Sequence, residues 1–291
     1  MIKTSVKNNV LSILRDPTTI LAFIAAIIMR FMNGFEMYRD ATGNFVDREL
    51  FLTEEAMSYA LNSFVGFAIS SLTNMAFPFL GIIVAINIFK DMKNNASDII
   101  FSVQMSFPKY FLSKILSYHI IGVLFCLFLT LLYSVLYACI QIPPEANLEW
   151  GKLILAQIVA IFVIDTSYLL IPTAWAVLGS ALTGVMFVGT IFNCIYLYLP
   201  NLIAGFQLGY TFWGHYIHVF PHTMYLYLEK WITYPKDEFF TFVYKDSYGP
   251  EATRMFTSFS DALLSYALQI LIAAILFTAS YFLLKRRFAR A

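Results

Sequence analysis

Long apolar stretches, separated by short polar segments, make up most of the sequence. An α-helix needs about 20 mostly apolar residues to cross the hydrocarbon core of a bilayer. Six stretches fit or approach this length, so we expect an all-α, polytopic membrane protein with six transmembrane helices. The predicted spans are residues 18–35, 56–89, 115–144, 153–178, 182–199 and 262–284.

Proline and glycine positions modify this pattern. Pro78 lies inside the long second stretch and predicts a kink, because proline removes a helical hydrogen bond. The small residues at 179–184 predict a tight turn between the fourth and fifth spans. Residues 200–261 begin with an apolar run that glycines and a proline interrupt, and a polar stretch follows. This composition favours a re-entrant segment followed by an extracellular segment.

The composition also indicates a membrane protein. Hydrophobic residues are 59% of the chain and charged residues 13%, whereas soluble domains carry about 25% charged residues. Such a chain is not an ordinary soluble enzyme, a disordered protein or a nucleic-acid binder. The cysteines lie within apolar stretches without metal-ligand spacing, so we expect buried packing residues at Cys126, Cys139 and Cys194.

The net charge of +1 conceals a strong asymmetry. With six spans, the segments on the side of the termini hold 11 basic and 3 acidic residues, and those on the opposite side sum to −7. Basic residues accumulate on the cytoplasmic side of membrane proteins. We therefore expect both termini in the cytoplasm, and we expect no cleavable secretory signal before the first span.

Residues 1–17 have the pattern of an amphipathic helix. Apolar side chains recur at helical spacing, at Ile2, Val6, Val10, Ile13 and Leu14. The polar positions include three basic residues that suit anionic lipid headgroups: Lys3, Lys7 and Arg15. Asp16 and Pro17 are expected to end the helix and turn the chain into the first span. This helix is either a simple membrane anchor or a surface that also docks a cytoplasmic partner.

Residues 90–114 form the one substantial cytoplasmic loop that this topology predicts. Ser97 is a suitable cap for a short helix, with Asp98 in its first turn. Phe107 is one of its apolar anchors, and Pro108 is expected to end it. Its exposed side chains are expected to be Phe101, Gln104 and Met105. Such a helix suits insertion into a cleft of another protein; the alternative is a connector that lies along the membrane.

The order of segments is an amphipathic helix, a span, an acidic outer loop, a long second span, this loop, and four more spans with a broken apolar segment before the last. Within the loop, Ser106-Phe-Pro-Lys109 is followed by Lys114 where the third span begins. Together these features resemble the type-2 ABC transporter permeases, the membrane subunits of many bacterial exporters. That family often has a glutamate and a glycine early in the loop, where this chain has Asn94, Asn95 and Asp98.

The resemblance implies one transmembrane permease domain over residues 1–291, in the bacterial cytoplasmic membrane. Two permease copies or homologues pair, and each is served by a separate ATPase subunit that binds ATP and Mg²⁺, so this chain needs no cofactor of its own. Residues 1–17 correspond to a connecting helix, 97–107 to the coupling helix and 202–228 to re-entrant short helices. The docking residues are then Ser97, Asp98, Phe101, Gln104, Met105, Phe107 and Pro108.

The chain has no phosphate-binding loop of the common kind. That motif is Gly-x4-Gly-Lys-Ser/Thr, and glycine pairs with its spacing, such as Gly179 and Gly184, are not followed by lysine. We therefore expect no catalysis by this chain itself. The expected cargo is amphipathic or hydrophobic, in the first place peptides or peptide toxins, with lipids, lipid-linked glycans or drugs as the alternative.

A few ionisable residues fall inside apolar sequence. Arg30 is expected to reach toward the outer interface or to meet Glu36. Asp165 serves either a transport pathway or a structural hydrogen bond. Three histidines share one helical face, which fits an interfacial polar surface, pH sensitivity or a metal site: His215, His218 and His222. No carboxylate or cysteine accompanies them, so we expect no metal. Remote alternatives are an intramembrane enzyme that uses Asp165 or the histidines, and a secondary transporter.

Overall fold

The fold is built from α-helices. The structure is a computed structural model, and it describes residues 2–37, 51–54, 56–71, 77–93, 106–162, 169–183, 188–192, 194–195 and 259–288. Within these residues the regular secondary structure is helical, and no strand occurs. The main helices are α1 (Ile2–Arg15), α2 (Pro17–Met37), α3 (Ala56–Ser71), α4 (Phe77–Lys93), α6 (Phe107–Gln141), α7 (Trp150–Ala160), α9 (Leu170–Thr183) and α14 (Phe259–Phe288). The all-α prediction is confirmed for the described part of the chain.

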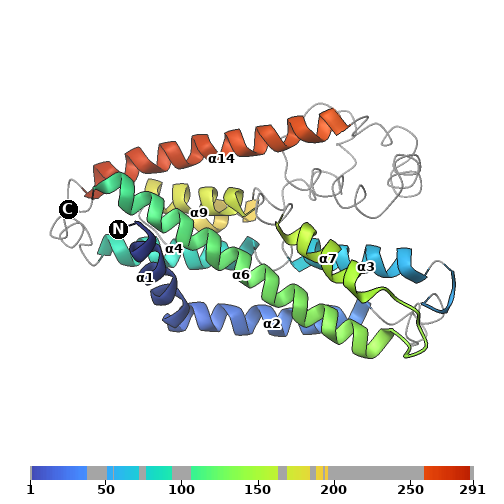
Figure 1. Ribbon diagram of the computed structural model, residues 1–291. Helices are drawn as coiled ribbons and strands as arrows, with labels where there is room; N and C mark the ends of the chain where they lie inside the picture. Colours follow the sequence, from blue (N-terminus) through green and yellow to red (C-terminus); the bar gives the residue numbers. More distant parts are fainter. Residues whose placement is uncertain are drawn as a thin grey trace.

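The helices form an elongated bundle. Figure 1 shows α2, α6 and α14 running along its length, with α1 and α4 toward one end and α3 and α7 toward the other. The start of α1 and the end of α14 lie at the same end. Helix α9 packs against α4 and α14, while α3 packs against α6 and α7.

Two described helices are long and apolar enough to cross a membrane: Phe107–Gln141 and Tyr266–Phe288. A third candidate arises if Lys3–Arg15 and Pro17–Met29, which meet at an angle of 64°, are counted as one bent span. Helices α7 and α9 are apolar but shorter. The described residues therefore give two or three candidate spans, and the six-span topology stays a prediction.

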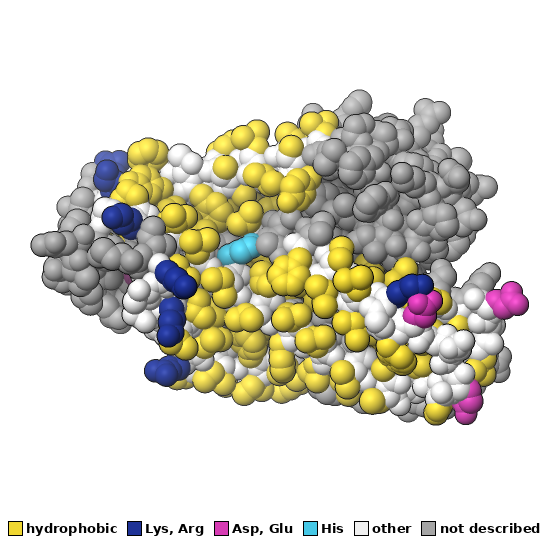
Figure 2. Space-filling view, in the orientation of Figure 1, with side chains coloured by type: hydrophobic (Ala, Val, Ile, Leu, Met, Phe, Trp, Pro, Cys, Tyr) yellow, Lys and Arg dark blue, Asp and Glu magenta, His cyan; other side chains and the backbone are white. Residues whose placement is uncertain are grey.

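Apolar side chains also cover much of the outer surface. Leu21 on α2, Leu155 on α7 and Phe282 on α14 are each more than half exposed. Figure 2 shows apolar side chains over most of the described face between the two ends of the bundle. Monomeric soluble proteins rarely expose continuous apolar surface on this scale, so the described part has the character of a membrane protein.

The second predicted span consists of two helices, α3 and α4. Pro78 is the second residue of α4, a place that proline tolerates because the first amide groups of a helix have no intrahelical acceptor. Pro78 therefore lies at the described start of α4, and the kink stays a prediction. Residues 72–76, between the two helices, lie outside the described residues.

The fourth predicted span also differs from the expectation. It comprises α7 and α9, and α9 continues to Thr183, so the predicted turn at 179–184 is wrong for residues 179–183. Gly179 serves close packing instead: a Cβ atom there would lie 2.5 Å from the Cα atom of Gly189. The absence of a side chain lets two backbones touch, which is the other common use of glycine between helices.

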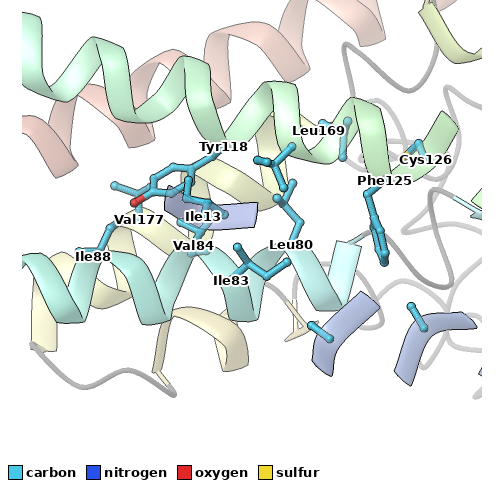
Figure 3. Close-up of a cluster of buried hydrophobic side chains, with 14 of the residues drawn as sticks. Ile13, Leu80, Ile83, Val84, Ile88, Tyr118, Phe125, Cys126, Leu169 and Val177 are labelled. Carbon is cyan, nitrogen blue, oxygen red and sulfur yellow. The ribbon is translucent and has the colours of Figure 1, made fainter. Parts of the chain in front are cut away.

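Three buried clusters lie within the described residues, and two of them join most of the helices. The larger one joins α1, α4, α6 and α9, and Figure 3 shows part of it: Ile13, Leu80, Ile83, Val84, Ile88, Tyr118, Phe125, Cys126, Leu169 and Val177. The smaller one joins α3, α6 and α7 through residues that include Phe51, Phe64 and Leu153. Cys126 is buried, as expected for a packing residue, but Cys139 is exposed, so the expectation of burial is wrong there.

The glycine contact provides a test of the α9 packing. We expect Gly179→Ala to lower the free energy of unfolding by about 1–3 kcal/mol, because the new methyl group collides with backbone and not with a movable side chain. The matched control is Gly151→Ala in α7, where a Cβ meets nothing within 4 Å. Thermal unfolding of the purified, detergent-solubilised protein measures both. Equal midpoints for Gly179→Ala and the wild type would contradict the close contact.

Candidate functional site

Charges are segregated between the two ends of the bundle. Figure 2 shows most of the basic side chains gathered at the end where α1 begins and α14 ends, and acidic side chains together with a basic one at the other end. The described basic residues on α1, on the end of α4, on the start of α6 and on the end of α14 are Lys3, Lys7, Arg15, Lys90, Lys109, Lys114, Lys285, Arg286 and Arg287. We call this the basic end. Most of the described basic residues, which are far apart in the sequence, thus lie at one end of the bundle.

At the basic end, an ion pair closes the base of the predicted coupling loop. The carboxylate of Asp91, near the end of α4, accepts a hydrogen bond from the Tyr110 hydroxyl at 2.6 Å and pairs with the Lys114 ammonium group at 2.7 Å. Both charged side chains are about four-fifths shielded from solvent. Charge-assisted bonds of this kind are stronger than neutral ones. The two ends of the loop are therefore held together; we call Lys90, Asp91, Tyr110 and Lys114 the loop base.

A second ion pair connects the loop base to the bend between α1 and α2. Asp16 lies at this bend, and its carboxylate accepts a hydrogen bond from the ammonium group of Lys90. The same carboxylate accepts the backbone amide of Thr18 at 2.9 Å, which caps the first turn of α2. The prediction that Asp16 and Pro17 end one helix and begin the next is confirmed, since α1 ends at Arg15 and α2 begins at Pro17.

The pKa of Asp16 reflects these contacts. Burial raises it, but the hydrogen bonds from Lys90 and Thr18 and the positive charge of Lys90 outweigh that effect, so the pKa of the carboxyl is lowered. Asp16 is accordingly ionised throughout the neutral range, and its pair with Lys90 persists there.

Helix α1 lies against α6 through small polar residues. The hydroxyl of Ser113 accepts hydrogen bonds from Ser5 at 3.2 Å and from Asn9 at 3.4 Å, and Ser113 is fully buried. Ile13 packs in the protein core, whereas Leu14 is exposed. The predicted apolar stripe of α1 is therefore divided between the protein interior and the outer surface. Its three basic residues, Lys3, Lys7 and Arg15, are exposed as expected.

The predicted docking residues fall into two groups. Five of them lie outside the described residues: Ser97, Asp98, Phe101, Gln104 and Met105. Phe107 and Pro108 belong to the first turn of α6, and Ser106 before them has an extended backbone, so the prediction that Pro108 ends a helix is wrong. A proline fits the first turn of a helix as well as a position just after a helix end. At both places its missing N–H group removes no hydrogen bond from a helix.

Phe107 is buried within this chain. Its ring lies 5.2 Å from the ring of Tyr281 and 5.9 Å from that of Phe288, both on α14. It is 7% exposed, so it anchors the start of α6 on α14. The third predicted span, 115–144, consequently begins earlier than expected, at the first residue of α6.

The remaining candidates have no described side-chain geometry. Arg30 lies within α2, and Asp165, His215, His218 and His222 lie outside the described residues. Among the residues that the structure describes, no group of three His, Cys, Asp or Glu side chains is arranged to hold a metal ion.

A buried polar contact at the opposite half of the bundle escaped the sequence analysis. The side-chain amide of Gln157 on α7 donates to the Ser134 hydroxyl at 2.6 Å and to the Phe64 carbonyl at 3.0 Å. It thereby joins α7 to α6 and α3. A glutamine inside an apolar run was the available signal, because polar side chains in such runs usually pair with a neighbouring helix.

Comparison with protein-family models, with curated proteins and with solved structures finds no match for this chain. Function is therefore inferred from the sequence pattern and from the geometry of the basic end. The loop base joins the end of α4, the start of α6 and the α1–α2 bend.

The strength of the loop base can be measured by neutralising its acceptor. We expect Asp91→Asn to lower the free energy of unfolding by about 1–3 kcal/mol, because Lys114 keeps its charge in a shielded place without a carboxylate. Glu149→Gln is the matched control: Glu149 pairs with Lys152 where both are exposed, and such a pair contributes less than about 1 kcal/mol. Thermal unfolding in detergent measures the stability of both variants. Equal losses of stability in Asp91→Asn and Glu149→Gln would show that the Asp91 ion pair stabilises the fold no more than an exposed pair does.

The Asp16–Lys90 pair predicts a pH dependence. A carboxyl whose pKa is lower in the folded protein stabilises the fold above its unfolded pKa of about 3.9, and this contribution disappears as the pH falls through the folded pKa. We expect Lys90→Met to cost about 0.5 kcal/mol, since Lys90 is partly exposed. The deficit should be constant between about pH 5 and 7 and vanish as the pH falls through the lowered pKa of Asp16. Unfolding midpoints across this range test it; a deficit that grows toward acid pH contradicts the assignment.

Proposed function

We propose that this chain is the transmembrane permease subunit of an ATP-driven ABC exporter. The observation that carries the proposal is the loop base: the loop between α4 and α6 is closed by Asp91, Tyr110 and Lys114 and is joined to the α1–α2 bend by Asp16 and Lys90. A force that a partner protein applies to a loop held in this way is transmitted to several helices at once. The resemblance of the sequence to type-2 permeases supplies the source of that force, a separate ATPase subunit.

The proposed mechanism is mechanical and not catalytic for this chain. ATP and Mg²⁺ bind to the partner ATPase, which moves the loop as it closes and opens. Because α4 and α6 are tied at the loop base and α1 lies against α6, we infer that these helices move together. A second permease copy or homologue completes the pathway.

The orientation follows from charge. The basic end is proposed to face the cytoplasm of a bacterial cell, since cytoplasmic segments are enriched in Lys and Arg. The acidic end then faces outward, and six spans place both termini in the cytoplasm. The loop is thereby on the side where ATP is available.

The proposed cargo is amphipathic or hydrophobic, in the first place peptides. The described helices carry few charges, and their buried polar groups are neutral, as with Gln157, Ser134 and Thr130. Such walls suit apolar or amphipathic molecules better than ions or sugars. Lipids, lipid-linked glycans and drugs share this chemistry and are the alternative.

The test is assembly with an ATPase. The full chain is co-expressed with each neighbouring gene product that carries a phosphate-binding loop, purified in detergent and placed in nanodiscs. We expect the pair to co-purify and Phe101→Asp to reduce co-purification at least about tenfold, because a carboxylate in an apolar docking cleft is strongly disfavoured. The matched control is Leu52→Asp, an equally severe change at an exposed residue far from the loop along the sequence.

Each outcome has a defined meaning. Loss of the ATPase in Phe101→Asp but not in Leu52→Asp supports docking through the loop. No association of the wild-type chain with the ATPase would falsify the proposed class. With an assembled complex, stimulation of ATP hydrolysis by amphipathic peptides but not by lipid vesicles supports peptide cargo, and the reverse supports lipid.

A further inference from the structure

The last turns of α14 lie against the loop base. Phe288, 7% exposed, packs on Phe107 with ring centroids 5.9 Å apart and on Tyr110 at 6.0 Å. One face of the preceding turns continues the contact, since Tyr281 lies 5.5 Å from Phe111. Five aromatic rings at the start of α6 and the end of α14 thus form one packed group, whose burial favours the contact by the hydrophobic effect and by edge-to-face geometry.

The neighbouring residue makes a different contact. Arg287 donates a hydrogen bond from its guanidinium group to the backbone carbonyl of Leu182 at 2.6 Å. Leu182 lies one residue before the described end of α9, near the negative end of the helix dipole. A cation is favourable at this end of a helix, both as a cap and because of the helix dipole. Arg287 therefore holds the end of α9.

These two contacts join parts of the chain that are far apart in sequence. Through Phe288, α14 touches the start of α6, and through Arg287 it touches the end of α9. Helix α9 in turn packs backbone to backbone against the helical residues after it, at Gly179 and Gly189. A displacement of the loop base can thus reach α9 and the following segment through α14, by a route that does not use α1.

We propose that the end of α14 is a strap that couples the loop base to α9, with Arg287 and Phe288 as its positioning residues. The strap is a property of the fold. Only its use, to deliver motion from an ATPase to the helices after α9, rests on the proposed function. Neither residue is expected to touch ATP or cargo.

The first experiment needs no partner. Hydrogen–deuterium exchange of the full chain in nanodiscs is followed at the end of α9 and at the start of α6. We expect Phe288→Leu to accelerate exchange at the start of α6, which it contacts, and also at the end of α9, to which the neighbouring Arg287 is hydrogen-bonded. Arg287→Ala should accelerate exchange at the end of α9 by about tenfold, the effect of losing one charge-assisted bond.

Matched variants separate the strap from general destabilisation. Arg287→Lys keeps a donor and a charge and should retain slow exchange, and Arg286→Ala, at the exposed neighbouring position, should leave both regions unchanged. In the double variant Phe288→Leu with Arg287→Ala, exchange at the end of α9 should equal that of Arg287→Ala alone, because the connection is already broken. Acceleration in Phe288→Leu confined to the start of α6, or strictly additive effects at α9, overturns the strap.

A second measurement links the strap to function. In the assembled complex, Arg287→Ala should leave ATPase binding and basal hydrolysis intact but reduce cargo movement per ATP hydrolysed at least about fivefold, with Arg287→Lys restoring it. If no ATPase assembles but the exchange pattern holds, the strap stands and the proposed function fails. If the ATPase assembles while Phe288→Leu leaves α9 unchanged, the proposed function stands and the strap fails.

Discussion

The arrangement at the basic end depends on the carboxylate of Asp91. It joins the end of α4 to the start of α6 by receiving Lys114 and Tyr110 together. Because Lys90 beside it pairs with Asp16, the α1–α2 bend is drawn to the same place. Shielded, multiply bonded ion pairs hold their partners far better than exposed pairs do, so this small network determines how the loop is attached to the bundle.

The helices around α9 depend on a different constraint, which is the lack of a side chain at two glycines. Gly179 and Gly189 let α9 and the segment after it approach until backbone meets backbone. Close packing of small residues is a strong source of helix association where the surroundings are as apolar as the helices themselves. With α9 also packed against α4 and α14, it is the element that lies between these two helices.

Proline and glycine were the least reliable signals in the sequence. Pro108 predicts a helix end but lies in the first turn of α6, because a proline ring is accepted at such a position as readily as at a break. Gly179 predicted a turn and lies inside α9, because the same missing Cβ serves turns and close contacts alike. Asp16-Pro17 was interpreted correctly, since a capping acid directly before proline is favourable at a helix start and hardly anywhere else in a helix.

The sequence by itself determined the helical class, the apolar character of the helices and the sign of each end, because these follow from local composition and from the order of charged segments. It also located the loop between α4 and α6. Only the tertiary structure decided that Asp91 meets Lys114, that Phe107 is buried on α14 and that Arg287 holds the end of α9. These contacts join residues from separate helices, and no periodicity or local spacing encodes which helix faces which; that choice is made by the packing of the whole bundle.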